Sequence, residues 1–404
     1  MKKVKHKLNK RILLLFILLV VLFFIGTIPI YASAESNNEN QVYENLNQTI
    51  FEQLQNLDFS GLDNFIKTLT FDTDSLFPTG SFKDKVLSII SGEFRENYSS
   101  ILNALLGLIF ESLLSFIPLF SLVIGIGILS SIMSNLTMNS KNKTIADIVH
   151  FVCYSLIIII VFTAVVNLSN VTAKTLSSMK MQIDLVFPIL LTIMTALGST
   201  VAASVYQPAV AMFSSTIVQL FSSIIMPLFI FTLVFNVVGN LSNDIQLKKF
   251  HEFFNSTFKW LVGTVFTIFT AFLSIQGITA GSFDKVSIRT AKFAIKSYVP
   301  IIGGYLSDGF NVIMASGVLI KNAVGFVGVI LMFFTILVPV IDLVILKLGL
   351  NLTAAILEPI TDKRISNFIM SVSKTLVMLL ATILAVAFMY FIMIGLIIST
   401  ANLI

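Results

Sequence analysis

Long apolar stretches separated by short polar segments recur from residue 113 to the end of the chain. A helix of about 20 apolar residues is long enough to cross the hydrocarbon layer of a membrane. The pattern therefore predicts an all-α fold, a polytopic membrane helical bundle with about eight transmembrane helices. The predicted spans are residues 113–134, 145–168, 184–204, 210–238, 259–281, 299–320, 323–346 and 375–399.

The sixth predicted span is the least regular of these stretches. Residues 299–320 contain few bulky apolar side chains and carry Gly303, Gly304, Asp308 and Asn311. If they cross the membrane, most of the Lys and Arg residues in loops fall on the cytoplasmic side, as is usual for short loops. If they do not cross, the bundle has seven helices and this bias reverses. We therefore favour the crossing.

The N-terminus has the pattern of a secretory signal. Several Lys and Arg residues precede an apolar run at 12–28, and Ala32-Ser33-Ala34 follows it. This order predicts a signal peptide at residues 1–34 with cleavage after Ala34. The alternative is an uncleaved signal anchor, because the apolar run is long. Both interpretations place residue 35 outside the cytoplasm.

Residues 35–110 are more polar than the rest of the chain. Leu46, Ile50, Leu54 and Leu57 recur at helical spacing, which predicts a small helical extracytoplasmic region. Residues 111–404 then form a multi-pass membrane domain.

Internal similarity suggests a repeat within the membrane domain. Two proline pairs share one spacing, and a basic pair follows each: Pro188, Pro227 and Lys248-Lys249, then Pro300, Pro339 and Lys363-Arg364. Residues 184–281 and 297–399 are therefore predicted to be two three-helix units. An odd number of crossings would invert the second unit, giving the inverted 3+3 repeat of many transporters. Chance similarity between apolar sequences is the alternative. The four prolines, Gly303 and Gly304 are candidate helix breaks.

Few polar residues lie within the predicted spans, so each is a candidate for function. Asp308 and Asn311 share a helical stripe with Gly304, which fits tight helix packing, a conducting surface or an interfacial break. Asp342, three residues after Pro339, could bind a cation or proton beside freed carbonyls, or reach the interface and pair with a lysine. With Gln207, these residues form a candidate intramembrane polar pathway.

A basic segment follows the fifth predicted span. Arg289, Lys292 and Lys296 fall on one helical face, which we predict to be cytoplasmic. Anchoring to anionic lipid headgroups explains this face, and docking of a protein partner is the alternative.

Composition narrows the class further. The chain has 404 residues, of which 56% are hydrophobic and 12% charged, whereas soluble domains carry about 25% charged residues. Its net charge of +5 is better explained by topology and lipid headgroups than by nucleic acid. A lone cysteine cannot form an intrachain disulfide. The sequence also lacks a phosphate-binding loop, a clustered metal-ligand set and a nucleophile motif, so we predict no catalytic, cofactor or metal site and no enzyme.

Three segments give the chain a specific likeness. They are SIRTAKFAIKSYVPIIGGYLSDGFN at 287–311, STVAASVYQPAV at 199–210 and LTAAILEPITDKRISN at 352–367. Together they resemble the stage III sporulation protein AE family of endospore-forming bacteria, and the likeness runs from about residue 185 to the C-terminus.

The resemblance implies a role that the residue pattern alone does not. It implies a polytopic membrane subunit of the channel-like complex between mother cell and forespore, required for endospore formation and late forespore gene expression. The implied partners are other stage III sporulation membrane proteins of the same operon and a forespore membrane protein. The implied location is the mother-cell membrane around the forespore. The alternative function is a transporter or pore that moves a small solute or ions through the repeat interface.

Overall fold

The computed structural model describes residues 39–69, 80–92, 98–138, 143–241, 248–298 and 303–400, and every regular element in these ranges is a helix. The predicted signal peptide, Ala34 and Pro300 lie outside them. The chain divides into one unit of residues 1–45 and a second of residues 46–404. In the first unit only the start of α2 (Glu39–Gln55) is described. The other described residues belong to the second unit.

Two short helices and the end of α2 precede the long helices. They are α3 (Ser60–Thr68) and α4 (Phe82–Ser91). A capping box between Ser81 and Asp84 starts α4, because each side chain binds a backbone N–H that the first turn leaves unpaired. The rings of Phe59 and Phe82 stack with their centroids 5.2 Å apart. This contact joins the start of α3 to the start of α4.

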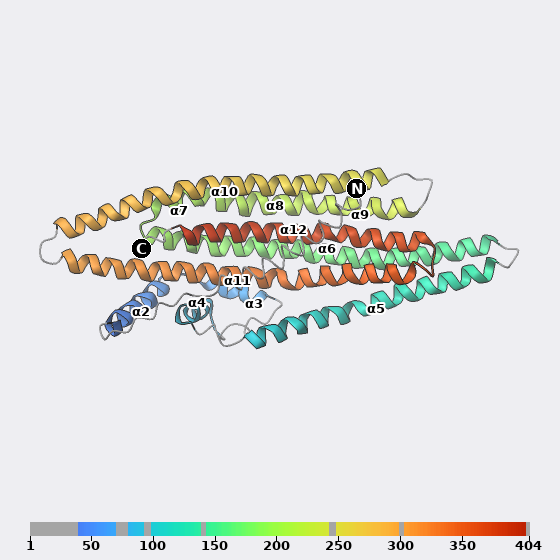
Figure 1. Cartoon of the computed structure of the whole chain (residues 1–404), viewed down its shortest axis with the longest axis horizontal. Coiled ribbons are helices and arrows are strands. Elements are labelled where there is room, and N and C mark those ends of the chain that lie inside the picture. Colours follow the sequence, from blue (N-terminus) through green and yellow to red (C-terminus); the bar gives the residue numbers. More distant parts are fainter. Residues whose placement is uncertain are drawn as a thin grey trace. The chain divides into compact units, whose positions relative to one another are not determined.

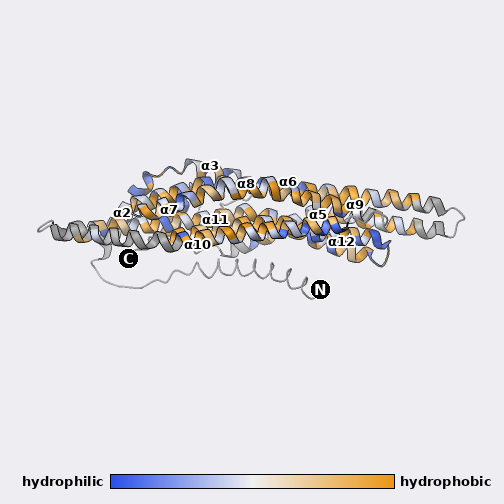
Figure 2. Ribbon diagram, turned by 90° about the horizontal axis from the view of Figure 1, so that it is seen from above, coloured by the Kyte–Doolittle hydropathy of each residue, from blue (hydrophilic) through white to orange (hydrophobic). Residues whose placement is uncertain are grey.

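Six of the described helices are long and apolar enough to cross a membrane, and they cover Asn103–Met133, Phe151–Ala196, Thr200–Gly239, Lys249–Gln276, Gly309–Leu357 and Lys363–Ser399. Five of them are continuous: α5 (Tyr98–Met138), α6 (Lys143–Ala196), α10 (Lys248–Tyr298), α11 (Gly303–Leu357) and α12 (Lys363–Ser399). Figure 1 shows them running side by side, and Figure 2 shows hydrophobic residues along most of their length. The all-helical, membrane-spanning prediction is confirmed.

The remaining long helix changes its winding twice. It consists of α7 (Thr200–Ala211), the π-helix η3 (Met212–Ile217), α8 (Val218–Leu220), the π-helix η4 (Phe221–Ile225) and α9 (Met226–Leu241). π-Helical turns are rare and occur frequently at functional sites. The elements η3 and η4 therefore mark this helix as unusual within the bundle.

The structure does not support eight spans, because two pairs of predicted spans merge. Residues 145–168 and most of 184–204 belong to α6, while most of 299–320 and all of 323–346 belong to α11. Several polar residues between the merged spans face other helices: Thr172, Gln182 and Lys321 are fully buried. The 54 residues of α6 extend about 81 Å. One continuous helix crosses the membrane once, and its excess length lies beyond the hydrocarbon.

The inverted 3+3 repeat is also not supported. A turn at residues 197–199 divides the first predicted unit, but the matching part of α11 is unbroken. Pro188 and Pro339 lie inside helices, Pro227 lies in the first turn of α9, and Gly303-Gly304 begin α11. In Figure 1, α9 and α11 run in the same direction and α10 and α12 return beside them. The repeated spacing therefore corresponds to two hairpins of the same orientation, α7–α10 and α11–α12.

The centre of the bundle is formed by α11 and α12. In their most apolar windows 67% and 61% of the residues are buried, against 17% in both α5 and α10. Glycines allow neighbours to approach α11 closely. A Cβ on Gly325 would lie 2.7 Å from the side chain of Ile398, closer than real contacts permit. Thus α11 and α12 pack inside, while α5 and α10 present apolar side chains outward.

Candidate functional site

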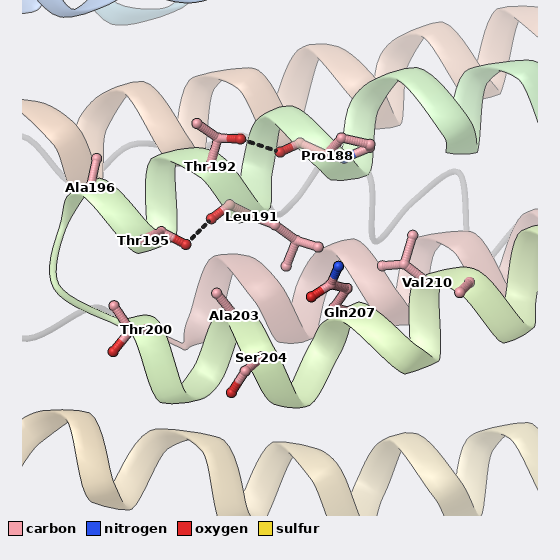
Figure 3. A pocket seen from close by; sticks show the side chains of 11 residues that line it. Pro188, Leu191, Thr192, Thr195, Ala196, Thr200, Ala203, Ser204, Gln207 and Val210 are labelled. Carbon is pink, nitrogen blue, oxygen red and sulfur yellow. Dashed lines mark hydrogen bonds between the residues drawn. The ribbon is translucent and has the colours of Figure 1, made fainter.

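A cleft of about 790 Å³ lies between the end of α6 and the start of α7 (Figure 3). A tight turn places the two helices next to each other. Gly198 has a φ of 76°, the left-handed conformation that favours glycine after a helix. The N–H of Ser199 donates to the carbonyl of Met194 (2.9 Å), so a backbone carbonyl at the end of α6 has a partner. The lining residues are Pro188, Leu191, Thr192, Thr195, Ala196, Thr200, Ala203, Ser204, Gln207, Val210 and Ala211.

Hydroxyl groups give this cleft its polarity. Thr192 donates to the carbonyl of Pro188 (2.8 Å) and Thr195 to that of Leu191 (2.9 Å), as drawn in Figure 3. Ser204 likewise donates to the carbonyl of Val201 (2.8 Å). Each hydroxyl has one proton to donate, so these three oxygens can offer only lone pairs to anything in the cleft. The walls therefore act mainly as hydrogen-bond acceptors.

An ion pair lies one helical turn beyond the cleft. Lys180 Nζ is 2.7 Å from Asp184 Oδ2, and the Ser214 hydroxyl on η3 donates to Asp184 Oδ1. Asp184 is one turn before Pro188, and Ser214 one turn after Ala211, so this group continues the line of the cleft. The side chains of Lys180 and Asp184 are 39% and 45% exposed, although both lie within the candidate span Phe151–Ala196.

The opposite face of the same turn of α6 is anchored in the core. Gln182 Nε2 donates to the Gly328 carbonyl on α11 (2.7 Å) and to the Tyr390 hydroxyl on α12 (3.1 Å). Thr335 shares its one hydroxyl proton between the Leu331 carbonyl (2.8 Å) and Gln182 Oε1 (3.3 Å), and the Tyr390 hydroxyl donates to the Gly328 carbonyl (3.2 Å). Gln182 and Tyr390 are fully buried. This network fixes α6, and hence Lys180 and Asp184, against the two central helices.

The residues of the predicted polar pathway are distributed over several surfaces. Gln207 lines the cleft, and Figure 3 shows its side chain pointing toward Leu191. Asp342 accepts a 2.6 Å hydrogen bond from Ser112, at the contact of α11 with α5. Asn311 is exposed on α11. Asp308 lies in the second turn of α11, and its side chain is outside the described set.

The predicted basic face lies beyond the candidate span of its helix. Arg289, Lys292 and Lys296 belong to the last turns of α10, after Gln276. Their position along the helix is therefore known, and a cytoplasmic location stays a prediction. Among the residues that the structure describes, no group of three or more His, Cys, Asp or Glu could hold a metal ion.

Sequence reasoning missed Lys180 and Asp184. It assigned Lys180 to a loop and Asp184 to the edge of the next span, because the surrounding residues are polar. Their four-residue spacing with opposite charge was the available signal, since such residues are neighbours on a helix. That signal is meaningful only if the helix is continuous, which the apolar pattern did not indicate.

Comparison with known proteins supplies the family. A family model described as Stage III sporulation protein AE matches residues 80–401. A curated protein of that name from Bacillus subtilis (strain 168) is 23% identical over 388 residues, covering 96% of this chain and 97% of the relative. No solved structure matches the chain. The family model includes all six long helices, and the chain therefore belongs to the stage III sporulation protein AE family.

Proposed function

We propose that this protein is the polytopic membrane subunit of a channel-like complex between mother cell and forespore, required for endospore formation and late forespore gene expression. The observation that carries the proposal is the extent of the family match, residues 80–401. It includes the central helices, the cleft and the outer helices together. A role in sporulation follows from the family, and the assembly is our inference.

The outer surface of the bundle supports a role as a membrane component. On α5, Phe110 is 61% exposed and Leu114 65% exposed, and on α10 Trp260 is 67% exposed. Side chains of this size are stable on a surface only against lipid or another apolar helix. We propose that these contacts are provided by the mother-cell membrane around the forespore, by other stage III sporulation membrane proteins of the same operon and by a forespore membrane protein.

The rival function, transport of a small solute or ions through an inverted-repeat interface, has less support. The two predicted units differ in the number of helices they contain. Asp342 accepts a hydrogen bond from Ser112 at the α5–α11 contact, whereas Gln207 lines the α6–α7 cleft. These two residues of the predicted pathway therefore lie on different surfaces. A single pathway that combines Asp342 with Gln207 therefore has no support.

The proposal is tested by complementation of an endospore-forming strain that lacks its own family member. The full chain should restore heat-resistant spores and a late forespore reporter, and partner stage III proteins should co-purify with it after mild solubilisation. A matched strain that expresses the chain without residues 98–404 controls for the N-terminal region. Normal spores without any family member, or restored spores with no co-purifying partner, would each contradict the assembly.

A further inference from the structure

One exposed face of the bundle carries many polar residues within the candidate spans Phe151–Ala196 and Thr200–Gly239. On α6 it includes Lys180, which pairs with Asp184, Asp184 itself, which binds Ser214 of η3, and Thr195, which lines the cleft with α7. On the returning helix the exposed residues include Ser204, Gln207, Ser215, Gln219 and Ser223. From Thr200 to Ser223 this face extends roughly 30–35 Å, comparable to the hydrocarbon thickness. We call the surface formed by these α6 and α7–η4 residues the polar face.

Such a surface does not fit contact with lipid. Hydrocarbon offers no hydrogen bonds, so polar groups at membrane depth face a protein interior or a water-filled cavity. The neighbouring helix α10 exposes apolar Ile268 and Ile275 beside the hydroxyls of Thr267 and Ser274, but no ion pair among these four residues. Lys180 and Asp184 are also too exposed to count as a buried pair. Water on the polar face accounts for both observations.

The chemistry of the polar face favours positive charge. Thr192, Thr195, Ser204 and Ser215 all donate their hydroxyl protons to carbonyls of their own helices. Gln219 donates to the Ser223 hydroxyl (2.9 Å), which uses one of that oxygen's lone pairs. Thr192, Thr195, Ser204 and Ser215 therefore present oxygen lone pairs outward. Such lone pairs can replace water around a small cation.

We propose that the polar face lines an aqueous pathway for small hydrated cations, in which Asp184 is the binding carboxylate and Lys180 a tethered cation that competes for it. The cleft of about 790 Å³ is one mouth of this pathway. The π-helix η3 places Ser214 against Asp184, so the carboxylate is held in place when Lys180 moves away. Of the residues in the predicted polar pathway, this aqueous pathway includes Gln207 but neither Asp308 nor Asp342, and it does not depend on the sporulation complex.

Cysteine reactivity tests the water directly. In full-length protein in native membranes, with Cys153→Ala as background, single cysteines replace Thr195, Gln207 and Ser215. The matched control is Ile268→Cys, which replaces an exposed apolar residue of α10. Because only thiolates in water react with methanethiosulfonates, the three cysteines should react about tenfold faster than the control. Equal, slow reaction at all positions would mean that lipid or a partner covers the polar face, and would overturn the proposal.

Charge preference is measured with the same variants. The ratio of rates for a trimethylammonium and a sulfonate methanethiosulfonate, relative to a free thiol, reports the local potential. At Ser215→Cys we expect the trimethylammonium-to-sulfonate rate ratio to exceed that of the free thiol. Asp184→Asn should lower this ratio about threefold, and Lys180→Met should raise it about threefold. A ratio that ignores both substitutions would exclude a cation site at Asp184. Gel filtration of each variant confirms folding, and Ser204→Cys replaces any variant that fails. Spore formation is scored separately, so failure here leaves the family role intact.

Discussion

Replacing Gln182 by Met should destabilise the bundle more than any substitution of an exposed glutamine. Gln182 makes two hydrogen bonds as donor and accepts one, and these join α6 to both α11 and α12. Met has a similar volume and no amide, so the change removes the bonds with little loss of packing. The effect therefore reports the hydrogen bonds rather than a cavity.

The magnitude follows from what the other groups retain. Interhelical hydrogen bonds in membrane proteins average about 0.6 kcal/mol, so loss of three costs about 2 kcal/mol. The Gly328 carbonyl still accepts from Tyr390 (3.2 Å), and Thr335 still donates to the Leu331 carbonyl (2.8 Å). Because neither is left unpaired, we expect no large additional penalty. Tyr390→Phe should cost about 1 kcal/mol, and the double variant should show coupling of about 0.5 kcal/mol or more.

The measurement is reversible unfolding of the purified protein in mixed micelles with increasing SDS. The control is Gln207→Met, since Gln207 is exposed in the cleft and has no hydrogen bond to another described residue. That variant should stay within about 0.5 kcal/mol of the parent. If Gln182→Met were no less stable than Gln207→Met, the buried network would not hold α6 to the core.

Three further predictions test other parts of the structure. Lys321 is fully buried and donates to a carbonyl at the end of α12 (2.9 Å). In the SDS titration, Lys321→Glu should therefore lower the free energy of unfolding by about 3 kcal/mol or more. Lys321→Met should lower it much less. Asp342→Ala should loosen α5 by removing the Ser112 hydrogen bond, seen as faster proteolysis within α5, while Asp342→Asn should restore protection. If residue 35 lies outside, an impermeant reagent added outside the cell should label Thr290→Cys. The same reagent should label Ile360→Cys only after permeabilisation. The reverse pattern would contradict the orientation.

The membrane-spanning class was predictable because it depends on apolar residues over long distances. Residues 375–399 lie entirely within α12, and 323–346 lie within α11. Apolar length is a robust signal, since lipid imposes it on any spanning helix. Helix ends are less robust. The predicted span 184–204 runs through the turn at 197–199, where Gly198 was the available local signal.

The number of helices was not predictable from polarity alone. A polar segment within an apolar pattern is either a loop or a part of a helix whose polar side chains meet other helices. Residues 169–183 belong to the second class: Thr172, Thr175 and Gln182 are buried against neighbours, and Lys174 faces outward. The distinction depends on tertiary partners such as Gly328 and Tyr390, which are far away in the sequence. No local pattern contains that information.

Only part of the candidate site could be predicted, because the rest depends on contacts between helices. Gln207 was selected as a polar residue within a predicted span, and it lines the cleft. Its neighbours across the cleft, Thr192 and Thr195, come from the preceding helix, and their contribution depends on the turn at Gly198 that the predicted span obscured. Lys180 and Asp184 form an ion pair because α6 is continuous, which places them one turn apart on the same helix.

Merging the spans also changes the inferred orientation of the chain. Each merged pair removes one crossing, so every helix between the two merges reverses its direction relative to the prediction. With residue 35 outside, the segments 139–142, 242–247 and 358–362 all become cytoplasmic, and each contains or borders a pair of basic residues: Lys141 and Lys143, Lys248 and Lys249, Lys363 and Arg364. The turn at 197–199, on the other side, carries no charge. This arrangement agrees with positive-inside topology at these four connections, whereas the basic end of α10 before residues 299–302 does not. It also moves Arg289, Lys292 and Lys296 to the outer side, where the same basic face would meet the outer leaflet or an extracytoplasmic partner.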